Sequence, residues 1–264
     1  MQSPERIGDF LIEVDEGGIA TVTFDRPPVN SVSIEVYEAL PELRRRLEHD
    51  AAVRVVILAA PDGARAWCGG ADLNDFVGMD PPKRKQRYAR INQLLPHLRE
   101  LERPTIAAIN AHTVGIGVVL AALCDLRVAA DSASFACKEI EYGLVPGEGG
   151  LLASLRMPQG LVREMLLTAR RFSAEEMRHG GYLNAVVPRA EVMAKARELA
   201  ALMAAKSLPA LRATKRTQVA IEGMEWDAAY LLAQEASAEL TGGEDAAEGV
   251  AAFLEGRPPR LVDR

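Results

Sequence analysis

Cysteine and aromatic residues are scarce in this 264-residue chain. Its three cysteines, Cys68, Cys124 and Cys137, form no CxxC pair, and aromatic residues make up 5% of the composition. An odd, unclustered set of cysteines fits a reducing cytoplasm better than a secreted, disulfide-bonded domain. The first residues also contain no apolar signal-peptide core, so we expect a cytoplasmic protein that folds without disulfides.

The sequence also has no long hydrophobic run and no surplus of positive charge. Its most apolar window, 113–124, contains two glycines and is too short to cross a bilayer. Acidic residues outnumber basic ones by 37 to 31, whereas a nucleic-acid-binding surface needs excess cations. We interpret one basic run, 83–87, as a solvated helix face, with phosphate contact or a lid-like role as the alternative. Neither nucleic acid nor a membrane is therefore an expected partner.

Several common site motifs are missing from the sequence as well. The turn Gly115-Ile-Gly117 has Leu120 where a dinucleotide-binding fingerprint needs its third glycine. There is no Walker-type Gly-Lys-Thr/Ser, no Gly-x-Ser-x-Gly elbow, and no His or Cys spacing typical of a metal site. We therefore expect no metal, and we exclude a Rossmann dehydrogenase.

What is present is an alternation of β-rich segments with helical ones. Residues 10–14 and 19–24 predict a hairpin, because two apolar runs flank a Gly-Gly turn. Further strands are expected at 53–60, 105–109 and 125–129, and helices at 33–50, 82–103 and 118–123. Alternation of this kind predicts an α/β fold.

From Glu191 onward the pattern becomes entirely helical. Helices are expected at 191–206, 208–221, 225–240 and 244–255. We therefore divide the chain into an α/β core over 1–195 and a helical region over 196–264, which packs on its own core or on a neighbouring subunit.

Two glycine-containing turns lie where a strand is followed by a helix. The first is Cys68-Gly-Gly-Ala-Asp72 and the second is Gly115-Ile-Gly117. Backbone N–H groups at a helix start have no internal partner, and glycine permits close approach of a ligand. Brought together by the fold, the two turns would form an oxyanion hole. Each turn alone is also consistent with tight packing of a helix on a sheet.

A Gly- and Pro-rich segment, 135–150, carries three acids, Glu139, Glu141 and Glu148. A loop after a strand can aim a carboxylate into a cleft, and the alternative for each acid is a solvated loop residue. Glu148 is also placed to cap a following helix. In an extended backbone, Glu141 would point in the same direction as Glu139.

Together, these segments resemble the crotonase superfamily, the enoyl-CoA hydratase/isomerase family. The resemblance rests on 68–73, on 107–117 with 124–129, and on 139–150, and it extends from Ile19 to Phe253. It implies a crotonase-like spiral of ββα units and a C-terminal helical region used in trimer contacts. It also implies a homotrimer or a dimer of trimers. The implied substrate is an acyl-CoA thioester, so that coenzyme A arrives as part of the substrate and no separate cofactor is needed.

The resemblance also assigns roles to residues. By match to the family motif, the N–H groups of Ala71 and Ile116 would hold the thioester oxygen, and Glu139 would be the general acid/base. We expect Asp72 mainly to cap the helix after the first turn. The residues expected to contact substrate are Gly70, Asp72, Leu73, Gly115, Gly117, Val119, Phe253 and Arg257.

One position departs from the family pattern. Hydratases of the family carry a second glutamate where this chain has Val119. Valine neither orients nor deprotonates water, so the sequence slightly favours double-bond isomerisation by one base in a site that excludes water. The alternatives are hydration with Glu148 or Glu141 as the second carboxylate, and an acyl-CoA-binding protein with little or no activity.

Overall fold

The computed structural model describes residues 4–147 and 157–263. Within them, seven strands form the main sheet in the order β1-β2-β3-β5-β8-β10-β13. Strands β1 to β3 pair antiparallel and the others pair parallel. Their bounds are β1 (Glu5–Ile7), β2 (Phe10–Val14), β3 (Ile19–Phe24), β5 (Val55–Ala59), β8 (Thr105–Ile109), β10 (Leu126–Ala130) and β13 (Ala185–Val187). The predicted hairpin is confirmed, whereas β1 was not expected.

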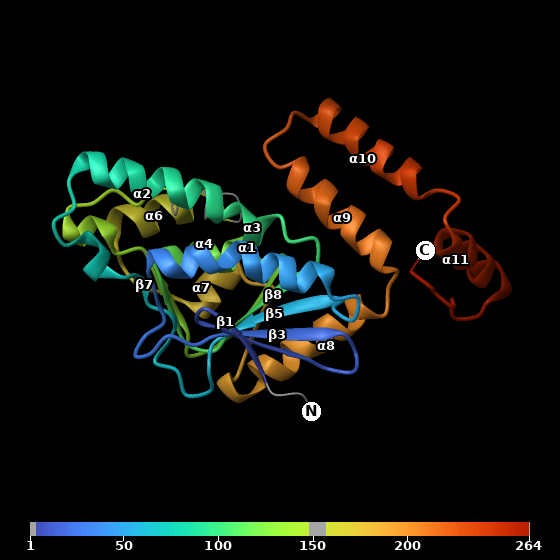
Figure 1. The fold of residues 1–264 in the computed structure, drawn as a ribbon, viewed down its shortest axis with the longest axis horizontal. Helices are drawn as coiled ribbons and strands as arrows, with labels where there is room; N and C mark the ends of the chain where they lie inside the picture. The colour runs from blue at the N-terminus through green and yellow to red at the C-terminus, as the bar shows by residue number, and fades with distance from the viewer. Residues whose placement is uncertain (1–3, 148–156, 264) are drawn as a thin grey trace.

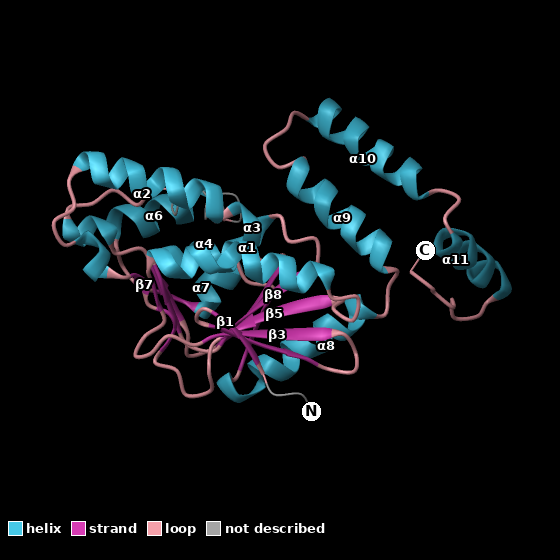
Figure 2. Ribbon diagram, viewed as in Figure 1, coloured by secondary structure: helices cyan, strands magenta, loops and turns pink. Residues whose placement is uncertain are grey.

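A second layer of short strands continues from the ends of the main strands (Figure 2). It contains a sheet in the order β12-β11-β9-β6 and a pair β4-β7. Their bounds are β4 (Ser31–Val32), β6 (Ala66–Cys68), β7 (Gly70–Ala71), β9 (His112–Val114), β11 (Ser134–Ala136) and β12 (Phe172–Ser173). A main strand, a short strand and a helical turn therefore follow one another repeatedly, which is the ββα spiral that the family resemblance implies.

Helices cover the sheets and account for most of the remaining chain (Figure 1). They are α1 (Ile34–His49), α2 (Pro81–Leu94), α3 (Pro96–Arg99), α4 (Ile116–Leu123), α6 (Gln159–Thr168), α7 (Ala174–His179), α8 (Val192–Ala204), α9 (Leu208–Ala220), α10 (Trp226–Leu240) and α11 (Glu244–Glu255). Short 3-10 helices are η1 (Leu73–Phe76), η2 (Glu139–Tyr142) and η3 (Arg189–Glu191).

The expected single helix over 82–103 is wrong. It divides into α2 and α3 at Pro96, and the helical conformation ends at Arg99. A proline has no N–H to donate and its ring clashes with the preceding turn, so α2 stops and α3 starts with Pro96 as its first residue.

The C-terminal helices lie close to their predicted positions, but they divide into two groups. Helix α8 packs on strands of the main sheet and buries Val192, Ala196 and Ala200. The expected boundary at 195/196 therefore falls inside a helix that belongs with the sheet. Helices α9 to α11, here called the C-terminal arm, extend away from this body (Figure 1). No helix in the described ranges is long and apolar enough to span a membrane.

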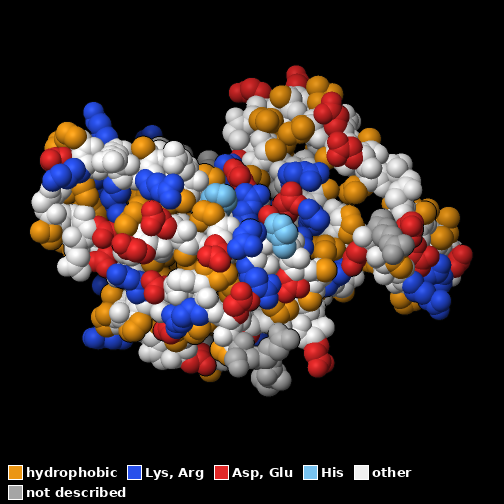
Figure 3. Space-filling view, viewed as in Figure 1, with side chains coloured by type: hydrophobic (Ala, Val, Ile, Leu, Met, Phe, Trp, Pro, Cys, Tyr) orange, Lys and Arg blue, Asp and Glu red, His pale blue; other side chains and the backbone are white. Residues whose placement is uncertain are grey.

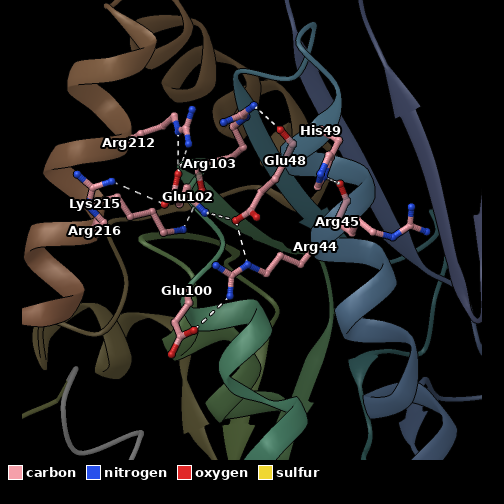
Figure 4. A network of polar contacts seen from close by, with 10 residues as sticks. All are labelled: Arg44, Arg45, Glu48, His49, Glu100, Glu102, Arg103, Arg212, Lys215 and Arg216. Carbon is pink, nitrogen blue, oxygen red and sulfur yellow. Dashed lines mark hydrogen bonds and ion pairs between the residues drawn. The ribbon is translucent and has the colours of Figure 1, made fainter.

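A network of ion pairs holds the base of the arm to the body (Figure 4). Arg212 of α9 bonds to the carboxylate of Glu102, and Lys215 of α9 pairs with Asp125 at 2.9 Å. Lys215 also donates to the carbonyl of Arg103 at 2.8 Å. Ion pairs and a hydrogen bond from side chains of α9 therefore attach the arm to the body.

Candidate active site

A cavity of about 480 Å³ lies among α2, η1, the start of α4 and η2. Residues from segments that are far apart in sequence line it. Six of the predicted site residues are among them, namely Gly70, Ala71, Leu73, Gly115, Ile116 and Glu139. The fold thus gathers the three motifs of the sequence around one cavity.

The two glycine turns meet at this cavity. A Cβ atom added at Gly115 would lie 3.8 Å from the Cα atom of Gly70 and 2.7 Å from Oε1 of Glu139. Gly115 also has a φ of +54°, and its N–H donates to the carbonyl of Ala136 at 2.8 Å. Glycine is required here both by the backbone conformation and by the close approach of the glutamate.

The N–H groups that follow the two glycines are oriented by their elements. The N–H of Asp72 donates to the carbonyl of Val32 at 3.0 Å, so the N–H of Ala71, one residue earlier in β7, points to the other edge of that strand. Ile116 is the first residue of α4, and the N–H at that position has no acceptor within the helix. Both residues line the cavity.

Glu139 stands at the beginning of η2, just after strand β11. Burial raises the pKa of its carboxyl above the ordinary value, and the backbone N–H of Glu139 and the charge of Arg84 offset this only in part. Its Oε2 atom is buried and has no hydrogen-bond partner among residues 4–147 and 157–263. A buried carboxylate oxygen without a partner costs free energy, and such perturbed groups are found more often at functional sites than elsewhere.

Three of the expected contact residues lie away from the cavity lining. Val119 is fully buried in the core, one turn along α4 from Ile116. At Gly117 an added Cβ would lie 2.7 Å from the Cβ of Cys68, so this glycine serves helix packing. Asp72 accepts from the N–H of Asn74 and pairs with Arg26 at 2.7 Å, which makes it the cap of η1 as predicted.

Glu141 and Glu148 are the two acids proposed as alternatives for a second carboxylate. Glu141 was expected in extended backbone, but η2 is a 3-10 helix, so Glu141 does not share the direction of Glu139 by strand alternation. It is exposed, lines the cavity and pairs with Lys138 at 2.6 Å. Glu148, the other candidate acid, lies outside the described residues.

Comparison with known proteins identifies the family. The family model for enoyl-CoA hydratase/isomerase matches residues 15–264. The carnitinyl-CoA dehydratase of Proteus mirabilis is 33% identical over 256 residues, covering 94% of this chain and 96% of the relative. The chain belongs to the enoyl-CoA hydratase/isomerase family.

Other members of the enoyl-CoA hydratase/isomerase family agree along their whole length. The short-chain-enoyl-CoA hydratase of Clostridium acetobutylicum is 30% identical, with 92% of this chain and 93% of the relative covered. The crystal structure of the Mycobacterium smegmatis enoyl-CoA hydratase superposes with a TM-score of 0.90 at 30% identity, covering 97% of this chain and 99% of that one. The crotonase fold is confirmed, and the chain is an enzyme of this family.

Two residues that the family resemblance placed at the ligand lie on the C-terminal arm. Phe253 is 84% exposed, and Arg257 is held by Glu248 and Glu255, the latter at 2.6 Å. Helix α11 lies at the opposite end of the molecule from α2 (Figure 1), whose residues line the cavity. Within one subunit these residues are therefore not brought to the site.

The sequence interpretation missed one part of the cavity wall. Arg84, Arg87 and Tyr88 of α2 line the cavity together with Phe76 of η1. The interpretation of the basic run 83–87 as a solvated helix face is wrong for Arg84 and Arg87, which line the cavity. The available signal was the spacing of Arg84 and Tyr88, which places both side chains on one face of the helix.

The cysteines do not supply a nucleophile. Burial raises the pKa of the thiols of Cys68, Cys124 and Cys137 to about 12. Only Cys137 lines the cavity. At neutral pH all three thiols stay protonated, so thiolate chemistry is not available at this site.

Proposed function

We propose that the protein converts acyl-CoA thioesters through an enolate, with Glu139 as the general acid/base. The observation that carries this proposal is the Oε2 atom of Glu139, which is buried without a partner among the described residues beside the meeting point of the two glycine turns. The N–H groups of Ala71 and Ile116 are the proposed oxyanion hole, because both line the cavity next to these glycines.

The proposed reaction moves one proton. For a 3-enoyl thioester, Glu139 removes a proton from the α-carbon, and the electron pair moves onto the thioester oxygen to give a dienolate. The two N–H donors stabilise that developing charge, which is absent in the ground state. The protonated Glu139 then returns the proton to the γ-carbon, so the double bond shifts into conjugation and Glu139 regains its charge.

Isomerisation is the reaction that we favour slightly over hydration. Val119, at the position of the second glutamate in hydratases of the family, is fully buried, and Glu141 is exposed and ion-paired. The names of the relatives, a dehydratase and a short-chain hydratase, favour hydration instead. Hydration would need Glu148 or Glu141 as the second carboxylate. The remaining alternative is an acyl-CoA binder with little or no turnover.

Purified protein assayed with matched 2-trans-enoyl-CoA and 3-enoyl-CoA tests these alternatives. We expect conversion of the 3-enoyl thioester that is lost in Glu139→Gln and retained in Glu141→Gln. Hydration of the 2-enoyl thioester that disappears in Glu148→Gln would overturn the preference for isomerisation. Binding of both thioesters without conversion of either would identify a binder.

We also propose that the C-terminal arm makes the contacts of a homotrimer, or of a dimer of trimers. Large apolar side chains are exposed along the arm (Figure 3), among them Trp226, Tyr230, Leu231, Phe253 and Leu254. Such a patch marks a surface for protein association. Light scattering on a size-exclusion column should give three or six subunits, and Leu231→Glu with Leu254→Glu should reduce that number.

A further inference from the structure

One wall of the cavity carries an arginine that is fixed in position but makes no ion pair within the described residues. The guanidinium of Arg84 lies over the rings of Phe76 and Tyr88, at 4.4 and 4.8 Å from their centroids. One terminal NH2 group donates to the Tyr88 hydroxyl at 2.7 Å. Two ring faces and one hydrogen bond hold the guanidinium plane, and no residue in the described ranges accepts a hydrogen bond from its other N–H donors.

Arg87 and Lys138, two further cations of the cavity wall, are compensated by acids, whereas Arg171 is exposed and donates to the hydroxyl of Ser134 at 3.1 Å. Arg87 pairs with Asp75 at 2.8 Å, and Asp75 also accepts from the N–H of Ile34. Lys138 pairs with Glu141 at 2.6 Å. Among residues 4–147 and 157–263, the polar side-chain partner of Arg84 is a neutral phenol. Arg84 differs from Arg171 because two aromatic rings hold its guanidinium and its charge acts on Glu139.

Tyr88 completes this donor set. Its hydroxyl accepts from Arg84, which leaves the phenolic proton for a second hydrogen bond. The hydroxyl lies so close to Gly147 that a Cβ atom added there would be 2.9 Å away. A planar guanidinium and an adjacent hydroxyl are the donors that suit a carboxylate, which accepts paired hydrogen bonds on its two oxygens.

The position of Arg84 indicates which part of a thioester would carry that carboxylate. Arg84 and Glu139 line the same cavity, and the charge of Arg84 acts on the Glu139 carboxyl. In an acyl-CoA thioester the phosphates are separated from the reacting carbons by the whole pantetheine arm. An anion that Arg84 binds in the part of the cavity near Glu139 would therefore belong to the acyl group.

We propose that Arg84, together with Tyr88, binds a carboxylate at the far end of the acyl chain. The preferred substrates are then CoA half-thioesters of dicarboxylic acids. This inference rests on the proposed function, since it assigns the acyl group of that same site.

The test compares binding of saturated thioesters, which need no turnover. Succinyl-, glutaryl- and adipoyl-CoA are each paired with the monocarboxylic thioester of equal length, and their dissociation constants are measured by calorimetry. We expect at least one dicarboxylic thioester to bind on the order of tenfold tighter than its partner, the size typical of a charge-assisted hydrogen bond. Arg84→Met should abolish that preference while leaving the monocarboxylic thioester unchanged, and Arg84→Lys should recover it only in part.

Arg90→Gln is the matched control, because Arg90 lies on the same helix, is exposed and has its nearest acid, Glu38, at 3.5 Å. It should keep the preference. No preference at any chain length, with both thioester types bound, would overturn the inference alone. An equal loss of both types in Arg84→Met would place Arg84 at the phosphates of coenzyme A and overturn it too. Failure of every thioester to bind would remove the proposed function itself.

Discussion

Partly buried charges occur at the base of the C-terminal arm and in the cavity, and the two places differ in whether the carboxylates have cationic partners. At the base of the C-terminal arm, Lys215, whose side chain is 5% exposed, pairs with Asp125 at 2.9 Å. Glu102 is bonded to Arg212 there and has Arg216 at 3.8 Å. In the cavity, one oxygen of Glu139 is buried with no partner among the described residues.

The pKa values of Glu139 and Glu102 are shifted in opposite directions, which agrees with this difference in partners. Burial raises the pKa of Glu139, and nearby favourable groups do not cancel this. Burial also acts to raise the pKa of Glu102, but the hydrogen bond and charge of Arg212, with Arg216 and Arg44, hold it below the ordinary value. The Glu102 carboxylate at the base of the arm is compensated by cations, whereas the carboxylate proposed for catalysis is left available for a proton.

The largest expected effect comes from removing the cavity charge. Glu139→Gln should reduce turnover by about 10²–10⁴-fold, because it removes the proposed acid/base. Its free energy of unfolding should not fall, since a neutral amide replaces a carboxylate without a full set of partners. Steady-state kinetics and denaturant unfolding measure the two quantities. A variant as active as the wild type would end the proposed role, with Glu141→Gln as the control at an exposed, ion-paired neighbour.

The second effect concerns stability rather than chemistry. Lys215→Met should lower the free energy of unfolding by about 3 kcal/mol, because breaking a buried ion pair leaves Asp125 without its cation. Lys195→Met removes an exposed pair with Glu198 and should cost less than about 1 kcal/mol. Equal midpoints for the two variants in urea would contradict the distinction between buried and surface pairs.

A smaller effect is expected from the glycine that approaches Glu139. In Gly115→Ala the added Cβ would lie 2.7 Å from Oε1 of Glu139 at a positive φ, which costs about 1–3 kcal/mol of strain. Turnover should fall because the carboxylate must move. Gly249→Ala, in α11 with no atom within 4 Å of its added Cβ, should leave turnover unchanged, and a similar loss there would remove the geometric explanation.

The smallest expected effect is a pH dependence. Activity, which depends on Glu139, and stability, which depends partly on Glu102, should change in different pH ranges. As a base, Glu139 must be ionised, so kcat/KM should rise with pH through its raised pKa. The folded-state pKa of Glu102 is lowered, so its stabilising contribution is present above the unfolded-state value and is lost as pH falls through the folded one. In Glu139→Gln the rise of residual activity should vanish while the acid-induced loss of stability remains. The opposite pattern would refute the contrast.

Local patterns in the sequence predicted most of the fold. The hairpin of β2 and β3 and the helices α8 to α11 lie close to their expected positions, because apolar periodicity and turn residues act over a few residues. The division of α2 from α3 at Pro96 has a local cause too, and it was missed because the apolar spacing continues through the proline.

For the candidate site, too, some features follow from local sequence and others only from the tertiary structure. The residue types and their order already indicated the family and the two glycine turns, and they predicted Glu139 as the principal acid. Only the tertiary structure decided that Gly70 and Gly115 meet beside Glu139, that Glu141 is ion-paired with Lys138, and that Arg84 lines the cavity. These outcomes depend on contacts between segments far apart in the chain, whose free energies no short stretch of sequence encodes.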